Sequence, residues 1–296
     1  MRIVSLLPSA TEILFGLGAG AEVVGVTFEC DYPEQARTRR IVSTSALPEG
    51  LTASQIDAAV TARLAAGEDL YHLQGHALAE IDPDLVVTQD LCAVCAVDVS
   101  VVTEALDYLG CRAEVLTLDP HTLDQVFASI LALGRATGRE DGAADLVEGL
   151  RTRVSDVQRA VAARPPVPVM VLEWTDPPFA PGHWVPDMVE AAGGRSVLGS
   201  AGEKSYRTTW AHVAAAGPAI VVAAPCGYDL PASVDLAEQL VRAGHVPAGL
   251  PVWAVDANAS FARPGPRLVD GIEALAALLH PQLALPLDGR LARQVA

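Results

Sequence analysis

Two cysteines separated by two residues, Cys92 and Cys95, are the sharpest chemical signal in the sequence. They follow an apolar run and precede a stretch of helical periodicity that begins near Asp98, so we expect them at the start of a helix. The dipole of a helix stabilises thiolate at its N-terminus, and thiolate is both the metal ligand and the redox nucleophile. Three interpretations remain open: a metal or cluster ligand pair, a redox dithiol, and two ordinary core cysteines.

Two further cysteines, Cys30 and Cys226, each come just after a predicted strand. Ligands of open α/β sheets bind at the carboxyl ends of the strands, so these thiols meet Cys92 and Cys95 if both halves of the chain turn those ends toward one cleft. Four thiolates suit Zn²⁺ or an iron–sulfur cluster. The competing interpretation makes Cys30 and Cys226 small buried hydrophobic residues, which is the role we expect for Cys111.

Aromatic residues form only 5% of the chain, yet several fall on predicted loops after strands. Such side chains bury a large area at little entropic cost and suit a flat macrocyclic ligand. A neutral imidazole at His183 is either a metal ligand or a hydrogen-bonded loop histidine, and the Arg263 guanidinium suits carboxylate, amide or phosphate groups. The candidate ligand-binding residues are Asp90, Glu173, Trp174, His183, Trp184, Tyr228, Phe261 and Arg263.

Short apolar runs that alternate with helix-period stretches predict the elements that position these residues. Such runs are typical of parallel strands, which helices cover on both faces of the sheet. Thr52 with Gln55 forms a capping-box pattern for a helix that runs to Ala66. The predicted strands are Ile3–Leu6, Val23–Val26, Leu85–Thr88, Glu114–Leu116, Val167–Leu172, Ala219–Ala223 and Val252–Val255.

The middle of the chain has a different pattern, because apolar residues from Thr122 to about Arg164 recur at helical spacing. Gly134 and Gly138 are the positions where this helical stretch can bend or divide. Arg164-Pro165-Pro166 ends it. We therefore predict an α/β protein with two Rossmann-like lobes: an N-terminal lobe of residues 1–121, a helical connector of residues 122–164, and a C-terminal lobe of residues 165–296.

Composition excludes several classes of protein. The chain of 296 residues has 36 acidic and 20 basic residues, a formal charge of −16 that repels nucleic acid and anionic lipid surfaces. Pro, Gly and charged residues interrupt every apolar stretch before it reaches the roughly 18 residues of a membrane span. The apolar start of the chain stops at Pro8, which is a poor match to an export signal, so we expect a cytoplasmic location.

Several segments together resemble the cobalamin- and iron-chelate-binding components of ABC importers. The resemblance spans almost the whole chain, and its most specific part is the opening Pro8-Ser9-Ala10-Thr11-Glu12. The other segments that carry it are Val24-Gly25-Val26, Asp31-Tyr32-Pro33, Ile81-Asp82-Pro83-Asp84-Leu85-Val86-Val87, Pro177-Pro178-Phe179, Ala192-Gly193-Gly194, Gly217-Pro218-Ala219-Ile220-Val221-Val222 and Arg263-Pro264-Gly265-Pro266-Arg267.

The resemblance implies a cleft between two lobes that holds a metal-containing small molecule without catalysis, with a corrinoid as the leading ligand and Trp174 on the cleft wall. It also implies one acidic residue per lobe for docking on a permease. The matching positions fall near His76 and Ala211, so transporter docking is not expected. Two alternatives remain: a metal or iron–sulfur cluster held by Cys30, Cys92, Cys95 and Cys226, and thiol redox activity at Cys92 and Cys95.

Overall fold

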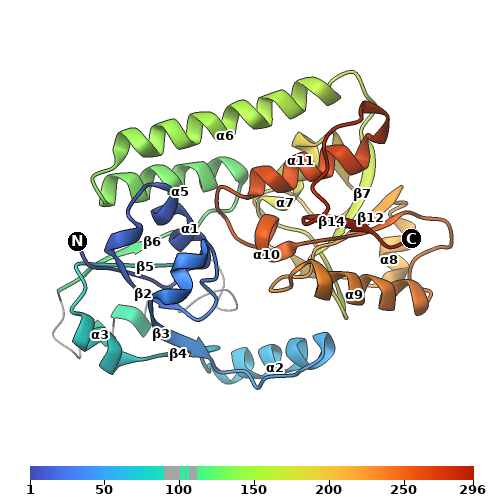
Figure 1. Cartoon of the computed structure of the whole chain (residues 1–296). Helices are drawn as coiled ribbons and strands as arrows, with labels where there is room; N and C mark the ends of the chain where they lie inside the picture. The colour runs from blue at the N-terminus through green and yellow to red at the C-terminus, as the bar shows by residue number, and fades with distance from the viewer. Residues whose placement is uncertain (90–100, 104, 107–111) are drawn as a thin grey trace. The chain divides into compact units, whose positions relative to one another are not determined.

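The computed structural model describes residues 1–89, 101–103, 105–106 and 112–296, and these residues divide into two units. The first unit contains Met1–Pro120 and Phe127–Val147, and the second contains His121–Val126 and Glu148–Ala296. Each unit is built on a mostly parallel sheet, which confirms the predicted α/β class (Figure 1). The three-part division of the chain at residues 121/122 and 164/165 stays a prediction.

A six-stranded sheet forms the centre of the first unit, in the order β4-β3-β2-β1-β5-β6. Neighbouring strands are parallel except β3 and β4, which are antiparallel. Val4, Val42 and Val86 of three different strands pack together in its core with Leu78. The strands are β1 (Ile3–Ser5), β2 (Val23–Thr27), β3 (Arg40–Ser45), β4 (Tyr71–Leu73), β5 (Leu85–Thr88) and β6 (Glu114–Thr117).

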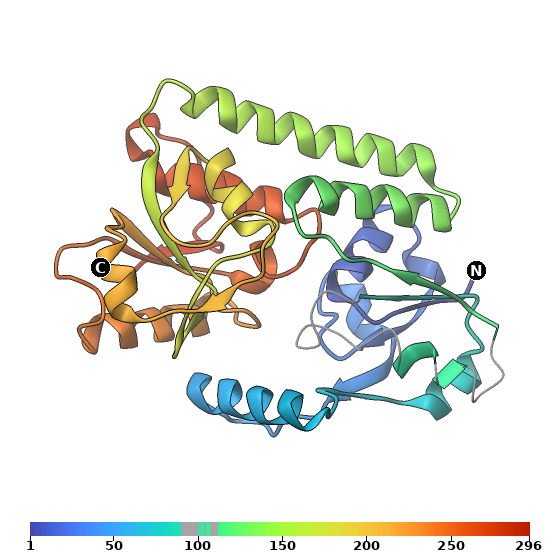
Figure 2. The ribbon, with the colours of Figure 1, turned by 180° about the vertical axis from the view of Figure 1, so that it is seen from behind.

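Within residues 1–89, three helices and two 3-10 turns connect the strands β1 to β5. The capping box predicted at Thr52 and Gln55 is present and starts α2, which ends at Ala66 as the sequence predicts. Both views of the ribbon show α2 continuing beyond the ends of β3 and β4 (Figure 2). The connecting elements are α1 (Pro8–Gly16), η1 (Gly20–Glu22), η2 (Glu34–Thr38), α2 (Ala53–Ala66) and α3 (Gly75–Ile81).

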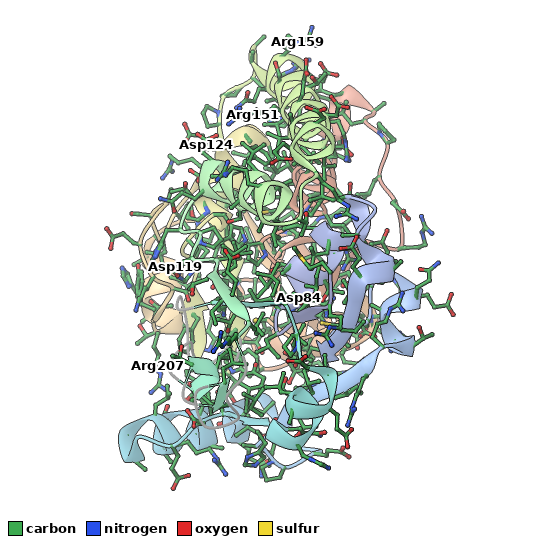
Figure 3. All side chains as sticks on the ribbon, turned by 90° about the vertical axis from the view of Figure 1, so that its left-hand side faces the viewer. Asp84, Asp119, Asp124, Arg151, Arg159 and Arg207 are labelled. Atoms are coloured by element: carbon green, nitrogen blue, oxygen red, sulfur yellow. The ribbon has the colours of Figure 1, made fainter. Side chains whose placement is uncertain are left out.

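The predicted helical stretch in the middle of the chain is two helices, α5 (Leu123–Ala136) and α6 (Glu140–Val161). The chain turns between them at Gly138, one of the two glycines at which a break was expected. Arg151 of α6 lies 3.7 Å from Asp124 of α5, measured from Nη2 to Oδ1 (Figure 3). Both side chains are solvent-exposed, so this ion pair adds little stability.

The second unit has a five-stranded sheet in the order β10-β7-β12-β13-β14, parallel except for β14, and a small antiparallel sheet in the order β11-β9-β8. Its strands are β7 (Val167–Leu172), β8 (Trp174–Thr175), β9 (Pro178–Ala180), β10 (Gly194–Ser196), β11 (Tyr206–Arg207), β12 (Ile220–Ala223), β13 (Val252–Val255) and β14 (Ala292–Gln294). Its remaining helices are α7 (Val185–Ala191), α8 (Trp210–Ala215), α9 (Leu230–Arg242), α10 (Ala257–Ser260), α11 (Leu268–Leu279) and the 3-10 turn η3 (Pro281–Leu283).

Helix α11 is strongly apolar, and most of its 12 residues are buried. Arg153 of α6 joins the two helices through hydrogen bonds to α11. It donates two to the Glu273 carboxylate, at 2.9 and 2.7 Å, and one to the Asp270 carboxylate at 2.6 Å. In the part of the chain that the structure describes, no helix combines the length and the apolar character that crossing a membrane requires.

The ion pair between Glu22 and Arg139 joins η1 to the start of α6 in the first unit. A hydrogen bond from this guanidinium lowers the pKa of Glu22 below its ordinary 4.5, against the opposing effect of burial. We expect Glu22→Gln to lower the free energy of unfolding by about 1 kcal/mol at pH 7. Because the folded-state pKa is the lower one, this difference is complete above pH 4.5 and disappears as the pH falls through the folded-state value.

Urea unfolding of both proteins at pH 7 and near pH 3 measures this difference. Glu148→Gln is the matched control, because Glu148 is exposed on α6 and its replacement is expected to change stability little. A loss of stability in Glu22→Gln that stays the same at both pH values would contradict the expectation.

Candidate functional site

The carboxyl ends of three neighbouring parallel strands bring most of the predicted ligand-binding residues of the second unit to one edge of its sheet. β7, β12 and β13 are in register, with Leu172 and Ala254 both paired with Ala223. Glu173 and Trp174 follow β7, Tyr228 follows β12, and Phe261 and Arg263 follow β13. This edge is where open α/β sheets bind ligands.

Trp174 and Tyr228 form a half-buried aromatic pair at this edge, with ring centroids 5.6 Å apart and planes tilted by 59°. The indole nitrogen of Trp174 donates a hydrogen bond to the Asp176 carbonyl at 3.1 Å, which fixes the ring. A phenol is protonated at neutral pH, and burial raises the pKa of the Tyr228 phenol further above this range. The pair therefore offers an apolar surface together with a hydroxyl donor.

The small antiparallel sheet extends this surface. Trp174 of β8 is paired with Phe179 of β9, and Phe179 is paired with Arg207 of β11, so the three side chains occupy one face. The guanidinium carbon of Arg207 lies 5.8 Å from the centroid of the Phe179 ring. We call Tyr228, Trp174 and Phe179 the aromatic row; Arg207, which is exposed, lies at its end.

Phe179 and Arg207 were not predicted as site residues from the sequence. Their strands are three and two residues long, too short for an alternating pattern to be recognised. One sequence signal does lie at this position, because Pro177-Pro178-Phe179 is among the segments that carry the family resemblance.

Glu173 is half-buried, and its carboxylate and backbone form hydrogen bonds with three other segments of the chain. Its carboxylate accepts a hydrogen bond from the Gly182 amide at 3.0 Å, and its carbonyl accepts one from the Cys226 amide at 3.0 Å. Its own amide donates to the Phe179 carbonyl at 3.3 Å. These bonds hold the loops that carry the aromatic row, and direct ligand contact by Glu173 stays a prediction.

His183 has a left-handed backbone, with φ of 50°, in a closely packed loop. Its amide donates to the Glu203 carbonyl at 2.6 Å, and its carbonyl accepts from the Gly202 amide at 3.0 Å. The imidazole lies against the ring of Trp184, at 5.6 Å between centroids, and the ring of His121, at 5.8 Å. A non-glycine residue held in this conformation is expected at a functional site more often than elsewhere, and metal binding by His183 stays a prediction.

Trp184 and Phe261 lie beneath the surface. They are 6% and 2% exposed, and the indole nitrogen of Trp184 donates to the Phe261 carbonyl at 2.8 Å. The hydrogen bond joins the loop before α7 to the residue after α10. Direct ligand contact by Trp184 and Phe261 stays a prediction.

Charges of both signs lie near Asp256, which directly follows β13. Burial and the neighbouring charge of Asp229 raise the pKa of Asp256, whereas the amide of Ala259 and the charges of Arg267 and Arg263 oppose the rise. Asp256 caps α10 with a 2.8 Å hydrogen bond from this amide. Arg263 is half-buried beside the capped helix, at the same edge as Tyr228, whose carbonyl accepts from the Asn258 amide at 3.2 Å.

The cysteines that the structure describes lie in different surroundings. Cys30, in the first unit, is 4% exposed, and its Sγ lies 3.0 Å from the hydroxyl of Thr11, which donates to Ser5 at 2.9 Å. Cys226, in the second unit, is exposed. Asp90, Cys92 and Cys95 are outside the described residues, so the four-cysteine site stays a prediction. Among residues 1–89, 101–103, 105–106 and 112–296, no three His, Cys, Asp or Glu side chains are grouped to hold a metal.

We expect iodoacetamide to modify Cys226 at least about 100-fold faster than Cys30 in the native protein, because Cys30 reacts only when the first unit opens. Peptide mapping by mass spectrometry separates the two rates from those of the other thiols. In urea the two cysteines should react alike. Equal rates in the native protein would place Cys30 at the surface and contradict the structure.

Comparisons with known proteins agree with this architecture. A sequence model of the periplasmic binding protein family matches residues 3–242. An uncharacterized ABC transporter substrate-binding lipoprotein of Bacillus subtilis strain 168 is 27% identical over 159 residues, which are 53% of this chain and 40% of that protein. The match therefore spans less than half of the length of that relative.

Two solved structures extend the likeness over nearly the whole chain. The periplasmic vitamin B12 binding protein of Vibrio cholerae is 19% identical, with a TM-score of 0.68 and 95% of this chain and 96% of that chain covered. A periplasmic heme binding protein from Pseudomonas aeruginosa is 21% identical, with a TM-score of 0.71 and coverage of 100% and 98%. At these identities the likeness shows the fold.

Proposed function

This chain belongs to the periplasmic binding protein family, and on that premise we propose that it binds a metal-containing chelate without catalysis, with a corrinoid such as cobalamin as the ligand. The aromatic row is the observation that carries the proposal. Tyr228, Trp174 and Phe179 give a continuous apolar surface at the carboxyl edge of a parallel sheet. A macrocycle has the flat apolar face that such a surface fits.

The charged groups around the aromatic row favour a chelate with acidic or amide groups at its periphery. Arg207 lies at one end of the row, and Arg263 lies at the same sheet edge. A guanidinium binds carboxylate and phosphate oxygens in a fixed two-pronged geometry, and the protonated phenol of Tyr228 donates to amide or carboxylate oxygens. Corrinoids and hemes both have such groups, and the two similar structures are named as vitamin B12 and heme binding proteins.

Titration of the protein with hydroxocobalamin and, separately, with hemin tests the proposal. We expect saturable binding of one hydroxocobalamin per chain, observed as quenching of tryptophan fluorescence and as heat in calorimetry. If hemin binds more tightly than hydroxocobalamin, the proposed ligand is a heme and not a corrinoid. If neither chelate binds at about 0.1 mM, where even a weak complex is populated, the proposal fails.

The alternative sites remain proposals of their own. Elemental analysis and an absorption spectrum of protein purified without oxygen or added ligand test the thiolate site of Cys30, Cys92, Cys95 and Cys226. Iron together with sulfide would support a cluster, and zinc would support a thiolate site. A protein that contains neither metal would leave reversible chelate binding as the remaining function. Thiol titration across a redox series tests whether Cys92 and Cys95 form a reversible disulfide.

Ligand binding between two lobes and a cytoplasmic location stay predictions. Transporter docking is a proposal as well. The Bacillus subtilis relative is named as an ABC transporter component, whereas His76 and Ala211 occupy the region where the resemblance expects acidic docking residues.

A further inference from the structure

A short segment at the point where the chain first enters the second unit lies against the loop before α7. The segment is His121–Val126, and it belongs to the second unit although the residues before and after it belong to the first. The amide of Leu123 in this segment donates to the carboxylate of Asp187, on α7, at 2.9 Å. The segment is therefore fixed to the second unit, and its contacts with the loop before α7 lie within that one unit.

Two histidines meet at this contact. His121 comes from the segment and His183 from the loop, and their ring centroids are 5.8 Å apart with planes tilted by 46°. Both side chains are half-buried. The imidazole ring is the commonest metal ligand in proteins, so two imidazoles that separate segments bring together are a candidate chelating pair.

The separation of the two rings matches that of two imidazoles bound to one metal ion. A ligating nitrogen lies about 2.0–2.1 Å from Zn²⁺, and the centre of its ring lies about 1 Å farther from the ion. For ligand angles of about 105–135° at the metal, two such ring centres are about 5–6 Å apart. The observed 5.8 Å falls in this range, so the two rings are at the distance that a shared ion requires.

The backbone of both histidines is held in place by hydrogen bonds of its own. The amide of His183 donates to the Glu203 carbonyl at 2.6 Å, and its carbonyl accepts from the Gly202 amide at 3.0 Å. The amide of His121 donates to the side-chain oxygen of Gln125 at 2.5 Å. Ligands that are positioned in advance lose less conformational entropy when an ion binds, and the left-handed backbone of His183 is a strain that binding sites often contain.

Two imidazoles select the class of metal ion. Imidazole nitrogen suits Zn²⁺, Cu²⁺ and Ni²⁺, whereas Ca²⁺ and Mg²⁺ prefer oxygen ligands. Within the part of the chain that the structure describes, no third His, Cys, Asp or Glu joins the pair in a metal-binding group. Water then occupies the remaining positions around the ion, which makes the ion exchangeable.

We propose that His121 and His183 together bind one divalent transition-metal ion of the Ni²⁺, Cu²⁺ and Zn²⁺ class. This site is separate from the proposed chelate and from the thiols, and it does not depend on the proposed function. A bound ion fastens the segment before α5 to the loop before α7. The amide of Gly182 in that loop donates to the carboxylate of Glu173, which precedes Trp174 of the aromatic row, so the ion also steadies one support of this row.

Calorimetric titration of the full chain with nickel chloride tests the site. We expect saturable binding of one Ni²⁺ per chain that needs both histidines. His121→Asn and His183→Asn should each weaken this binding at least about tenfold, because the second imidazole of a chelating pair binds at a high effective concentration. Asparagine is the replacement at both positions because it tolerates the left-handed backbone of His183.

His245→Asn is the matched control in the same unit. His245 is exposed and stacks on Trp210, away from the pair in sequence, so its replacement should leave the Ni²⁺ affinity within about twofold of the parent. Thermal unfolding without metal checks that each variant keeps its fold. X-ray absorption at the nickel edge of the parent protein identifies the ligands, and we expect nitrogen and oxygen neighbours without sulfur.

The outcomes separate this site from the other proposals. If the parent binds neither Ni²⁺ nor Zn²⁺ at about 1 mM, the site is wrong. Sulfur neighbours around nickel, or a folded variant at either histidine that keeps the parent affinity, would place the ion elsewhere and overturn the pair. If a variant does not fold, the ligands in the spectrum of the parent decide. The proposed function stands or fails on the hydroxocobalamin titration alone.

Discussion

Replacing Gly199 with alanine is expected to lower the free energy of unfolding by about 4 kcal/mol or more, the range reserved for severe backbone or packing conflicts. Gly199 has φ of +83°, and a Cβ at this position would lie 1.9 Å from the carbonyl oxygen of Pro181. Because the conflict is with backbone rather than with a flexible side chain, the loop must move to relieve it. Urea unfolding measures the loss.

Gly217→Ala is the matched control in the same unit. Gly217 also has a positive φ, +64°, but nothing lies within 4 Å of the added Cβ. Its cost is then the backbone strain alone, about 1–2 kcal/mol. Equal losses in the two variants would show that the close approach to Pro181 does not limit stability. If Gly199→Ala still folds, the conflict must displace Pro181 and with it the adjoining Gly182-His183 loop. We then expect hydroxocobalamin binding to weaken as well.

Replacing Trp174 with alanine is expected to weaken hydroxocobalamin binding about 100-fold, the effect of removing a central aromatic side chain from a binding surface. Trp174 contacts Tyr228 and is paired with Phe179, so its loss divides the aromatic row. Trp174→Phe keeps a ring at this position and should recover most of the affinity. Calorimetry gives the affinities, and thermal unfolding checks that the fold is kept.

Trp210→Phe controls for a general effect of altering a tryptophan in this unit. Trp210 stacks on His245, with ring centroids 4.7 Å apart and planes within 4°, on α8. Its replacement should leave chelate affinity within about twofold of the parent. If Trp174→Ala binds hydroxocobalamin as tightly as the parent protein, the aromatic row is not the basis of binding.

The central strands and the main helices could be predicted from the sequence because their signals are local. All seven predicted strands are present, with ends that differ by one residue at most. Six of them lie in the interiors of the two sheets, where burial on both faces requires continuous apolar runs such as Val167–Leu172; the seventh, β6, is an edge strand. The capping box of α2 and the break near Gly138 also depend on neighbouring residues alone.

The elements that the sequence did not predict depend on pairing with distant residues. β3 is an interior strand, but its sequence RIVSTS has no continuous apolar run, so it was not predicted. β4, β10 and β14 are three-residue edge strands, β9 also has three residues, and β8 and β11 have two residues each. Arg207 becomes part of a surface only because β11 pairs with β9, which no local pattern records. A loop after a strand likewise does not distinguish an outward ring, such as Trp174, from a buried one, such as Phe261.

The chain passes between the two units three times, and this path constrains the order in which it folds during synthesis. His121–Val126 belongs to the second unit, but Phe127–Val147 belongs to the first. Phe127, Ile130 and Leu133 of α5 are buried side chains of the first unit. A nascent chain that has emerged only as far as Pro120 therefore lacks part of its core, and the first unit is complete on the ribosome only after Val147 has left the exit tunnel.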